Sequence, residues 1–148
     1  MSRAFDYVLM VALGAAVTVA TTAATRQGGQ AKPAQANDWQ LPPDAADKQN
    51  PLSVDDKVLA QGKSVFKDKC QRCHGPGGLG DGPDADPDAR ADMDLTDPKR
   101  GDRNPDGVVF YKVWNGRRKP KMPTFKEELT EQQVWAVVAY TQTLRKKR

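Results

Sequence analysis

Apolar residues recur at spacings of three and four in two stretches of the chain, and this pattern predicts two amphipathic helices. The first helix is expected over residues 54–69, with Ser53 as its N-cap. The second is expected to begin after Thr130, because Thr130 and Gln133 have the spacing of a capping box. The apolar stripe of this second helix consists of Val134, Val137, Val138, Thr141 and Leu144.

The chain between these helices contains one shorter apolar stretch. Residues 75–106 are rich in glycine and hold five prolines and nine aspartates, which predicts an ordered loop or several turns. Residues 108–114 are compatible with a strand or a short helix. No partner strand is visible, so a two-turn helix is favoured, followed by a proline-bounded loop over residues 117–125. Without strand–helix alternation an α/β nucleotide-binding domain is excluded, and the fold class is all-α.

The first 25 residues are predicted to be a signal peptide or an N-terminal membrane anchor. No charge occurs from Tyr7 to Thr25, and the most apolar part, residues 8–20, suits a signal-peptide core. As a helix, the 19 uncharged residues would instead span about 28 Å, enough for an anchor. Residues 26–52 have no apolar periodicity and are expected to be a flexible linker. The folded domain is then residues 53–148.

Composition and charge narrow the function classes. The 148 residues are only 38% hydrophobic, so the core is small and an added cofactor is plausible. The net charge is +4, and residues 108–148 hold ten basic and three acidic side chains. Such a surface either steers an acidic partner or is merely solvated. The three tryptophans are scattered and accompany no basic–aromatic motif, so no nucleic acid is expected.

The motif Cys70-Gln71-Arg72-Cys73-His74 has the spacing of a c-type haem attachment site. Positions i, i+3 and i+4 lie on one side of a helix, so two thiols can add to the haem vinyl groups while the imidazole reaches the iron. A thioredoxin-like pair lacks its βαβ context, and a zinc site lacks a second pair of soft ligands. We therefore expect one haem c per chain, joined by thioethers to Cys70 and Cys73.

His74 is the only histidine, so the sixth ligand is a methionine, another donor or nothing. Outside the export segment the methionines are Met93 and Met122. Pro120 and Pro123 bracket Met122 and hold it with little entropy to lose, which favours Met122 as the second metal ligand. If it does not bind, the iron has an open site, and the protein is a small-ligand sensor or a catalytic haem subunit.

Residues 51–148 resemble the class I c-type cytochromes, in particular the bacterial single-haem branch. The resemblance rests on Gly62, Phe66, the Cys70–His74 motif, Gly80-Asp81-Gly82-Pro83, Leu95-Thr96, Met122-Pro123, Trp135 and Tyr140. It implies a small fold of three to four helices around a covalently attached haem, with His74 and Met122 as axial ligands.

The same resemblance implies supporting contacts around the haem. The Pro83 carbonyl would accept a hydrogen bond from the His74 ring. Gly62 would allow the first and last helices to cross closely, with Phe66 near Val137 and Tyr140.

The expected function is one-electron transfer without catalysis, as a periplasmic shuttle or the haem subunit of a membrane redox chain. The protein would lie on the periplasmic side of the bacterial inner membrane, bound to it through residues 1–25 if these are not cleaved. Its expected partners are redox proteins with an acidic docking face, steered by Arg117, Arg118, Lys119 and Lys121. A third possibility is a structural subunit whose haem serves only as a folding core.

Overall fold

The computed structural model describes residues 39–145 of the chain. Residues 1–25, with the expected signal peptide or anchor, and residues 26–38 of the expected linker lie outside this range. Every regular element in the described range is helical, and two isolated β-bridges are the only strand-like pairs there, which confirms the all-α class. None of the helices described is both long and apolar enough to cross a membrane.

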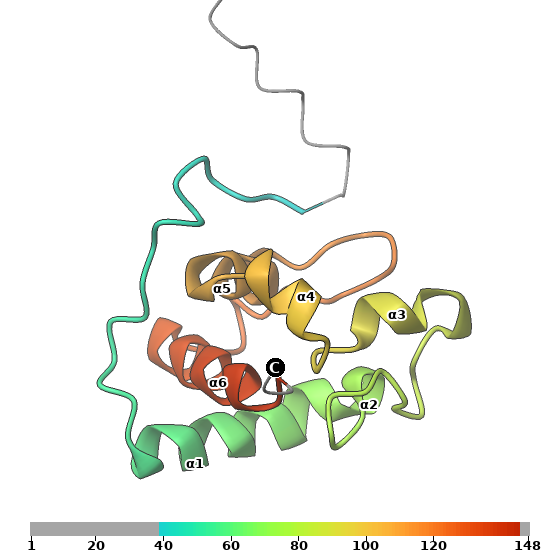
Figure 1. Ribbon diagram of the computed structural model, residues 1–148, viewed down its shortest axis with the longest axis horizontal. Helices are drawn as coiled ribbons and strands as arrows, with labels where there is room; N and C mark the ends of the chain where they lie inside the picture. Colours follow the sequence, from blue (N-terminus) through green and yellow to red (C-terminus); the bar gives the residue numbers. More distant parts are fainter. Residues whose placement is uncertain (1–38, 146–148) are drawn as a thin grey trace, which may run out of the picture. The chain divides into compact units, whose positions relative to one another are not determined.

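The helices follow one another as shown in Figure 1. In chain order they are α1 (Asp56–Val65), a π-helical turn (Phe66–Cys70), α2 (Gln71–His74), a 3₁₀ turn (Pro87–Ala89), α3 (Arg90–Met93), α4 (Pro98–Asp102), α5 (Asp106–Asn115) and α6 (Glu131–Thr143). The first three are contiguous, so one helical run carries the chain to the end of the Cys70–His74 motif.

The first helix begins two residues later than the sequence pattern predicts. Asp55, not Ser53, is its N-cap, and the Asp55 carboxylate accepts a hydrogen bond of 2.8 Å from the Val58 amide. Val54 therefore lies before the helix, with 54% of its surface exposed. Ser53 and Asp55 are both residue types that can serve as an N-cap. The ionised carboxylate of Asp55 is also favoured by the helix dipole at the N-terminus.

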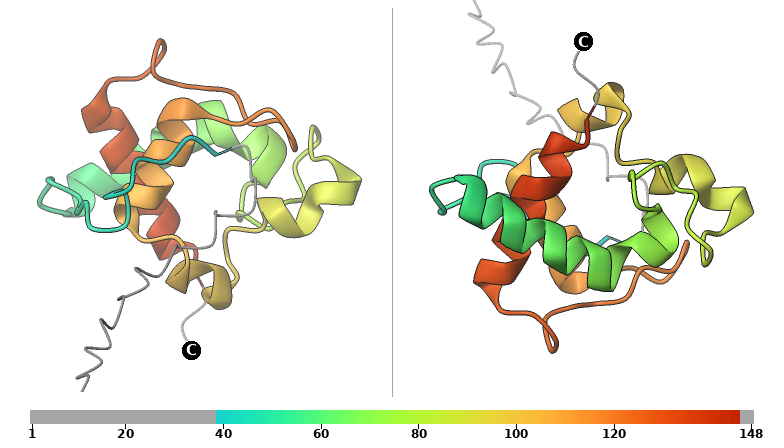
Figure 2. Two further views of the ribbon diagram at one scale, coloured as in Figure 1. Left: turned by 90° about the horizontal axis from the view of Figure 1, so that it is seen from above. Right: turned by 90° about the horizontal axis from the view of Figure 1, so that it is seen from below.

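Helices α1 and α6 cross closely, and Gly62 makes the crossing possible (Figure 2). A Cβ atom at Gly62 would overlap the main-chain carbonyl of Ala136 on α6. Helix α6 opens with the predicted capping box of Thr130 and Gln133. Its buried residues form an unbroken run, residues 134–139, rather than one stripe, because α1 and α5 both pack against it.

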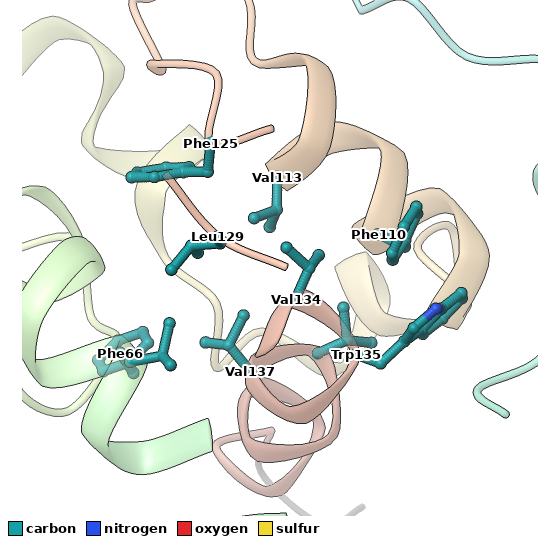
Figure 3. Packing of buried hydrophobic residues seen from close by; sticks show 10 residues of the cluster. Phe66, Phe110, Val113, Phe125, Leu129, Val134, Trp135 and Val137 are labelled. Atoms are coloured by element: carbon teal, nitrogen blue, oxygen red, sulfur yellow. The ribbon is translucent and has the colours of Figure 1, made fainter. Parts of the chain in front are cut away.

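The core combines aromatic rings with valine and leucine side chains (Figure 3). The rings of Phe110 and Trp135 stack with their centroids 4.2 Å apart. Phe66 lies in the same buried cluster as Val137, and its ring centroid is 5.4 Å from that of Tyr140. These contacts agree with the placement of Phe66 that the family resemblance implied.

The segment expected to be loop contains short helical turns, while the ambiguous stretch after it is the predicted helix, α5. Asp86 and Asp97 each cap a turn whose first residue is a proline. Proline is preorganised for that position and lacks the amide that would otherwise be unpaired there. These Asp-Pro steps divide the loop into turns and lead the chain around the pocket described below.

Residues 39–52 pack on the helical domain, which differs from the expected flexible linker. Ala45 is buried, and the Asn50 side-chain amide donates to the Trp135 carbonyl at 3.0 Å. The Lys48 ammonium lies 4.8 Å from the centre of the Phe110 ring. Single polar and cation–π contacts hold this segment, and such contacts leave no periodic pattern in a sequence.

Candidate functional site

A pocket opens between the end of the first helical run, α3, α4, α5, α6 and the loop of residues 117–122. It encloses about 970 Å³ of free space, including its open mouth. The apolar part of its wall includes Phe66, Met93, Leu95, Val109, Val113, Met122, Val137 and Val138. Three of the residues singled out from the sequence, Cys70, His74 and Met122, line this one pocket.

The Cys70–His74 motif lies at the end of the helical run. Cys70 closes the π-helical turn, and Cys73 and His74 belong to α2, which ends at Gly75 with a φ of 75°. Both thiols are free, and Cys73 is not among the pocket-lining residues. Burial, with a smaller contribution from the nearby Cys73, raises the pKa of the Cys70 thiol to about 12.

The His74 ring is held by α3. Its Nδ1 atom lies 2.7 Å from the Met93 carbonyl oxygen, so the neutral ring donates from Nδ1 and presents the Nε2 lone pair. Burial lowers the pKa of His74; the Met93 carbonyl opposes this, while Arg100 and Arg117 lower the pKa further. These effects favour the neutral imidazole, the form that binds a metal.

The expected Pro83 contact is wrong in this structure, because the His74 ring is paired with the Met93 carbonyl instead. The amides of Gly80, Gly82 and Asp84 donate to the carbonyls of His74, Cys73 and Arg72, at 2.8, 3.3 and 2.8 Å. Pro83 itself is exposed. The loop therefore satisfies the carbonyls at the end of α2, and the acceptor for the ring comes from Met93, 19 residues beyond His74.

An ion pair ties the same loop to the motif. The Arg72 guanidinium makes two bonds to the Asp84 carboxylate, Nε to Oδ2 at 2.6 Å and Nη2 to Oδ1 at 3.1 Å. The Arg72 hydrogen bond lowers the pKa of Asp84. Both side chains are largely exposed, so this pair orients the loop and is not part of the pocket wall.

Met122 is presented by a tight loop between α5 and α6. The Arg117 amide donates to the Met122 carbonyl at 2.9 Å, and the Met122 amide donates to the Arg117 carbonyl at 3.0 Å. Gly116, with a φ of 65°, turns the chain into this loop. The Thr124 hydroxyl donates to the Trp114 carbonyl at 2.6 Å and fastens the far side of the loop to α5.

Cationic side chains line one part of the pocket wall, and most of them were not found from the sequence. They are Arg100, Lys112, Arg117, Lys121 and Arg145. Burial, with smaller contributions from the nearby Arg100 and Arg117, lowers the pKa of Lys112 to about 8. Arg100, Lys112 and Arg145 come from separate parts of the chain, so no local motif in the sequence groups them with the Arg117 and Lys121 of the Met122 loop.

Arg117 does not lie on the surface with the other three cations that were expected to steer a partner. Its side chain is only 11% exposed, whereas Arg118, Lys119 and Lys121 are exposed. The Arg117 guanidinium lies 4.5 Å from the centre of the Trp39 ring, and Trp39 also lines the pocket. Arg117 is therefore part of the pocket wall rather than an outward-facing cation.

Comparison with known proteins gives one family. The family model described as Cytochrome c matches residues 59–145, more than half of the chain. No curated protein matches the chain significantly. The family match implies a covalently bound haem c and haem-based electron transfer, and it agrees with the spacing of Cys70 and Cys73.

The residues of the pocket fit a haem c. Haem c needs two thiols for its vinyl groups, nitrogen or sulfur donors for its iron, and an apolar wall for its ring. Cys70, His74 and Met122 line the pocket, Cys73 precedes His74 on α2, and the apolar wall contains four valines and one phenylalanine. Haem also carries two carboxylates, and the half-buried cations Arg100 and Lys112 in the pocket wall are suited to meet negative charge.

Proposed function

This chain belongs to the cytochrome c family, and we propose that it is an electron-transfer protein with a single haem c and no catalytic activity of its own. Cys70 and Cys73 bind the haem through thioether bonds. His74 and Met122 are the two axial ligands of its iron. When bound, the haem supplies one-electron exchange between ferric and ferrous iron.

The observation that carries this proposal is the convergence of Cys70, His74 and Met122 on one pocket. His74 ends α2, whereas Met122 belongs to the loop after α5, 48 residues later. An imidazole and a thioether form the donor set of a His/Met haem iron, and a cysteine thiol provides the covalent attachment of the porphyrin.

Met122 is favoured over Met93 as the second axial ligand. Both methionines line the pocket, but the Met93 carbonyl bonds to the His74 ring, so Met93 lies on the same side as the imidazole. Two axial ligands must reach the iron from opposite faces of a planar ring. The loop that carries Met122 forms a separate part of the wall, which suits it to the second face.

The chain's own residues then keep the iron inaccessible to other ligands. His74 is held by the Met93 carbonyl, and Met122 is held by its two backbone bonds to Arg117. With both axial positions filled by protein, a partner exchanges electrons with the haem without binding to the iron. The thioether sulfur favours the softer ferrous iron and so raises the reduction potential.

For the partner, we propose a redox protein with an acidic docking face. The exposed cations Arg118, Lys119 and Lys121 belong to the Met122 loop, and they would orient such a partner near the pocket. We further propose that the domain lies on the periplasmic side of a bacterial inner membrane. The uncharged stretch of residues 7–25 supports export, as a cleaved signal or a retained anchor.

The ligand assignment is tested with two matched variants, Met122→Leu and Met93→Leu. Each removes one sulfur and nearly conserves side-chain volume, so both are expected to fold. Met122→Leu is expected to lose the weak long-wavelength ferric absorption band of the Met–iron bond, to lower the reduction potential and to bind carbon monoxide when reduced. Met93→Leu is expected to keep the wild-type spectrum.

Two results would contradict the proposal. If Met93→Leu loses the band while Met122→Leu keeps it, the ligand is Met93. If the wild-type protein is high-spin and its reduced form binds carbon monoxide, the iron has an open site, and a sensor or catalytic subunit is the better interpretation.

A further inference from the structure

We propose that Arg117 is a positioning residue that braces Met122 against α3, the helix whose Met93 carbonyl bonds to the His74 ring. The inference rests on the proposed function, because it requires Met122 to be an iron ligand. Arg117 is part of the cationic run before Met122, but its environment differs from that of its exposed neighbours.

The main chain of Arg117 is paired directly with that of Met122. The two residues exchange both of their backbone hydrogen bonds, at 2.9 and 3.0 Å. The loop between them contains only four residues, and Gly116 turns the chain immediately before it. Any displacement of the Arg117 backbone therefore displaces Met122.

The side chain of Arg117 continues this brace in two directions. Its Nε atom donates to the Pro120 carbonyl at 2.9 Å, within the Met122 loop. Its Nη2 atom lies 3.4 Å from an Asp92 carboxylate oxygen on α3. The Arg117 side chain is only 11% exposed, whereas the Asp92 side chain is 49% exposed, so the brace runs from the pocket wall to the surface of α3.

The far end of the brace lies next to the support of the other axial ligand. Asp92 immediately precedes Met93, whose carbonyl accepts the hydrogen bond from the His74 ring. One guanidinium thus joins the Met122 loop to the four-residue helix that orients His74. The ring of Trp39 lies 4.5 Å from the guanidinium carbon and covers it.

This arrangement needs arginine rather than a positive charge alone. The planar guanidinium carries donors that point in several fixed directions, so it can bond Pro120 and Asp92 at once. Lysine has a single ammonium group on a flexible stem and cannot reproduce both contacts with the same geometry. The requirement separates a positioning role from a general electrostatic one.

The test is the competition between Met122 and added imidazole in the ferric, haem-loaded protein. Imidazole binds only when Met122 has left the iron. The apparent dissociation constant of imidazole is therefore inversely proportional to the fraction of protein in which Met122 is detached. Arg117→Gln is expected to lower that constant by about tenfold, since it removes two bonds made by a charged group. The Met–iron absorption band is expected to weaken in parallel.

Arg90→Gln is the matched control. It also removes a guanidinium group, in this case from α3, two residues from Asp92. Arg90 is exposed and does not line the pocket. Its imidazole affinity is expected to equal that of the wild-type protein. Arg117→Lys, which keeps the charge, is expected to show most of the change seen in Arg117→Gln.

The outcomes separate this inference from the proposed function. If the wild-type protein has no Met–iron band, the proposed ligation fails and this inference fails with it. If the wild-type band is present but Arg117→Gln binds imidazole as Arg90→Gln does, only the inference is overturned. A wild-type imidazole affinity in Arg117→Lys would also overturn the inference, because a positive charge alone would then be sufficient.

Where Arg117→Gln does not incorporate haem, Asp92→Asn gives the same test from the other end. It removes the carboxylate charge that Arg117 meets, together with the 3.4 Å contact of Arg100 to the same carboxylate, and leaves the sequence of the Met122 loop unchanged. A several-fold gain in imidazole affinity supports the brace. An affinity equal to that of the wild-type protein overturns it.

Discussion

Replacing Gly62 with alanine tests the close crossing of α1 and α6. The added Cβ atom would overlap the Ala136 carbonyl and lie 2.9 Å from the Tyr140 Cβ atom. Since the overlapping neighbour is main chain, it cannot rotate away, and the two helices must separate. Phe66, one turn along the same helical run, would lose part of its packing against α6.

The free energy of unfolding is expected to fall by about 2 kcal/mol. Overpacking against a rigid neighbour costs about 3 kcal/mol, at the upper end of its usual range. Alanine in place of glycine inside a helix returns about 1 kcal/mol. For a domain of this size, the net loss corresponds to a melting temperature lower by about 10 °C.

The assay is denaturant unfolding of the haem-loaded protein, followed by circular dichroism and by haem absorption. Gly77→Ala is the matched control, because the nearest atom to its added Cβ would be 3.8 Å away, in ordinary contact. Its stability is expected to stay within about 0.5 kcal/mol of the wild-type value. A Gly62→Ala protein as stable as the wild type would refute the close-crossing argument.

Two further predictions concern surface charge. The bond to Arg72 lowers the pKa of Asp84 in the folded state. Ionised Asp84 therefore stabilises the folded state at pH values above its unfolded pKa of about 3.9. This stabilisation is lost as the pH falls toward the lower pKa of the folded state. In thermal unfolding between about pH 2 and 6, Asp84→Asn is therefore expected to flatten the acid dependence of stability; an equal effect of the exposed Asp88→Asn would contradict this. For docking, the double variant Arg118→Gln, Lys119→Gln, whose two side chains are exposed and lie outside the pocket wall, is expected to slow electron exchange with an acidic redox protein at low ionic strength, measured by stopped flow, and to match the wild type at high salt. Unchanged rates at low salt would count against this docking surface.

Much of the fold and part of the site could be predicted from short stretches of sequence. The spacing of Cys70, Cys73 and His74 follows from one helical turn, and the capping box of α6 needs only Thr130 and Gln133. Each signal depends on groups within a few residues of one another. Their hydrogen bonds and side-chain directions are therefore set almost entirely by local backbone geometry.

The contacts that could not be predicted from the sequence join residues that are distant along the chain. The acceptor for the His74 ring is the carbonyl of Met93, 19 residues away at the end of α3, rather than that of Pro83. The packing of residues 39–52 depends on single contacts such as the Asn50 bond to Trp135, 85 residues away. No periodicity or motif records such pairs.

The amino-acid sequence by itself determined the helical class, the haem-attachment motif and the small set of candidate axial ligands. Only the tertiary structure decided which carbonyl orients His74, which cations line the pocket and that Arg117 lies inside its wall. The physical reason is the range of the interactions. Helix periodicity and capping act over a few residues, whereas the pocket exists only after α1, α5 and α6 have packed together.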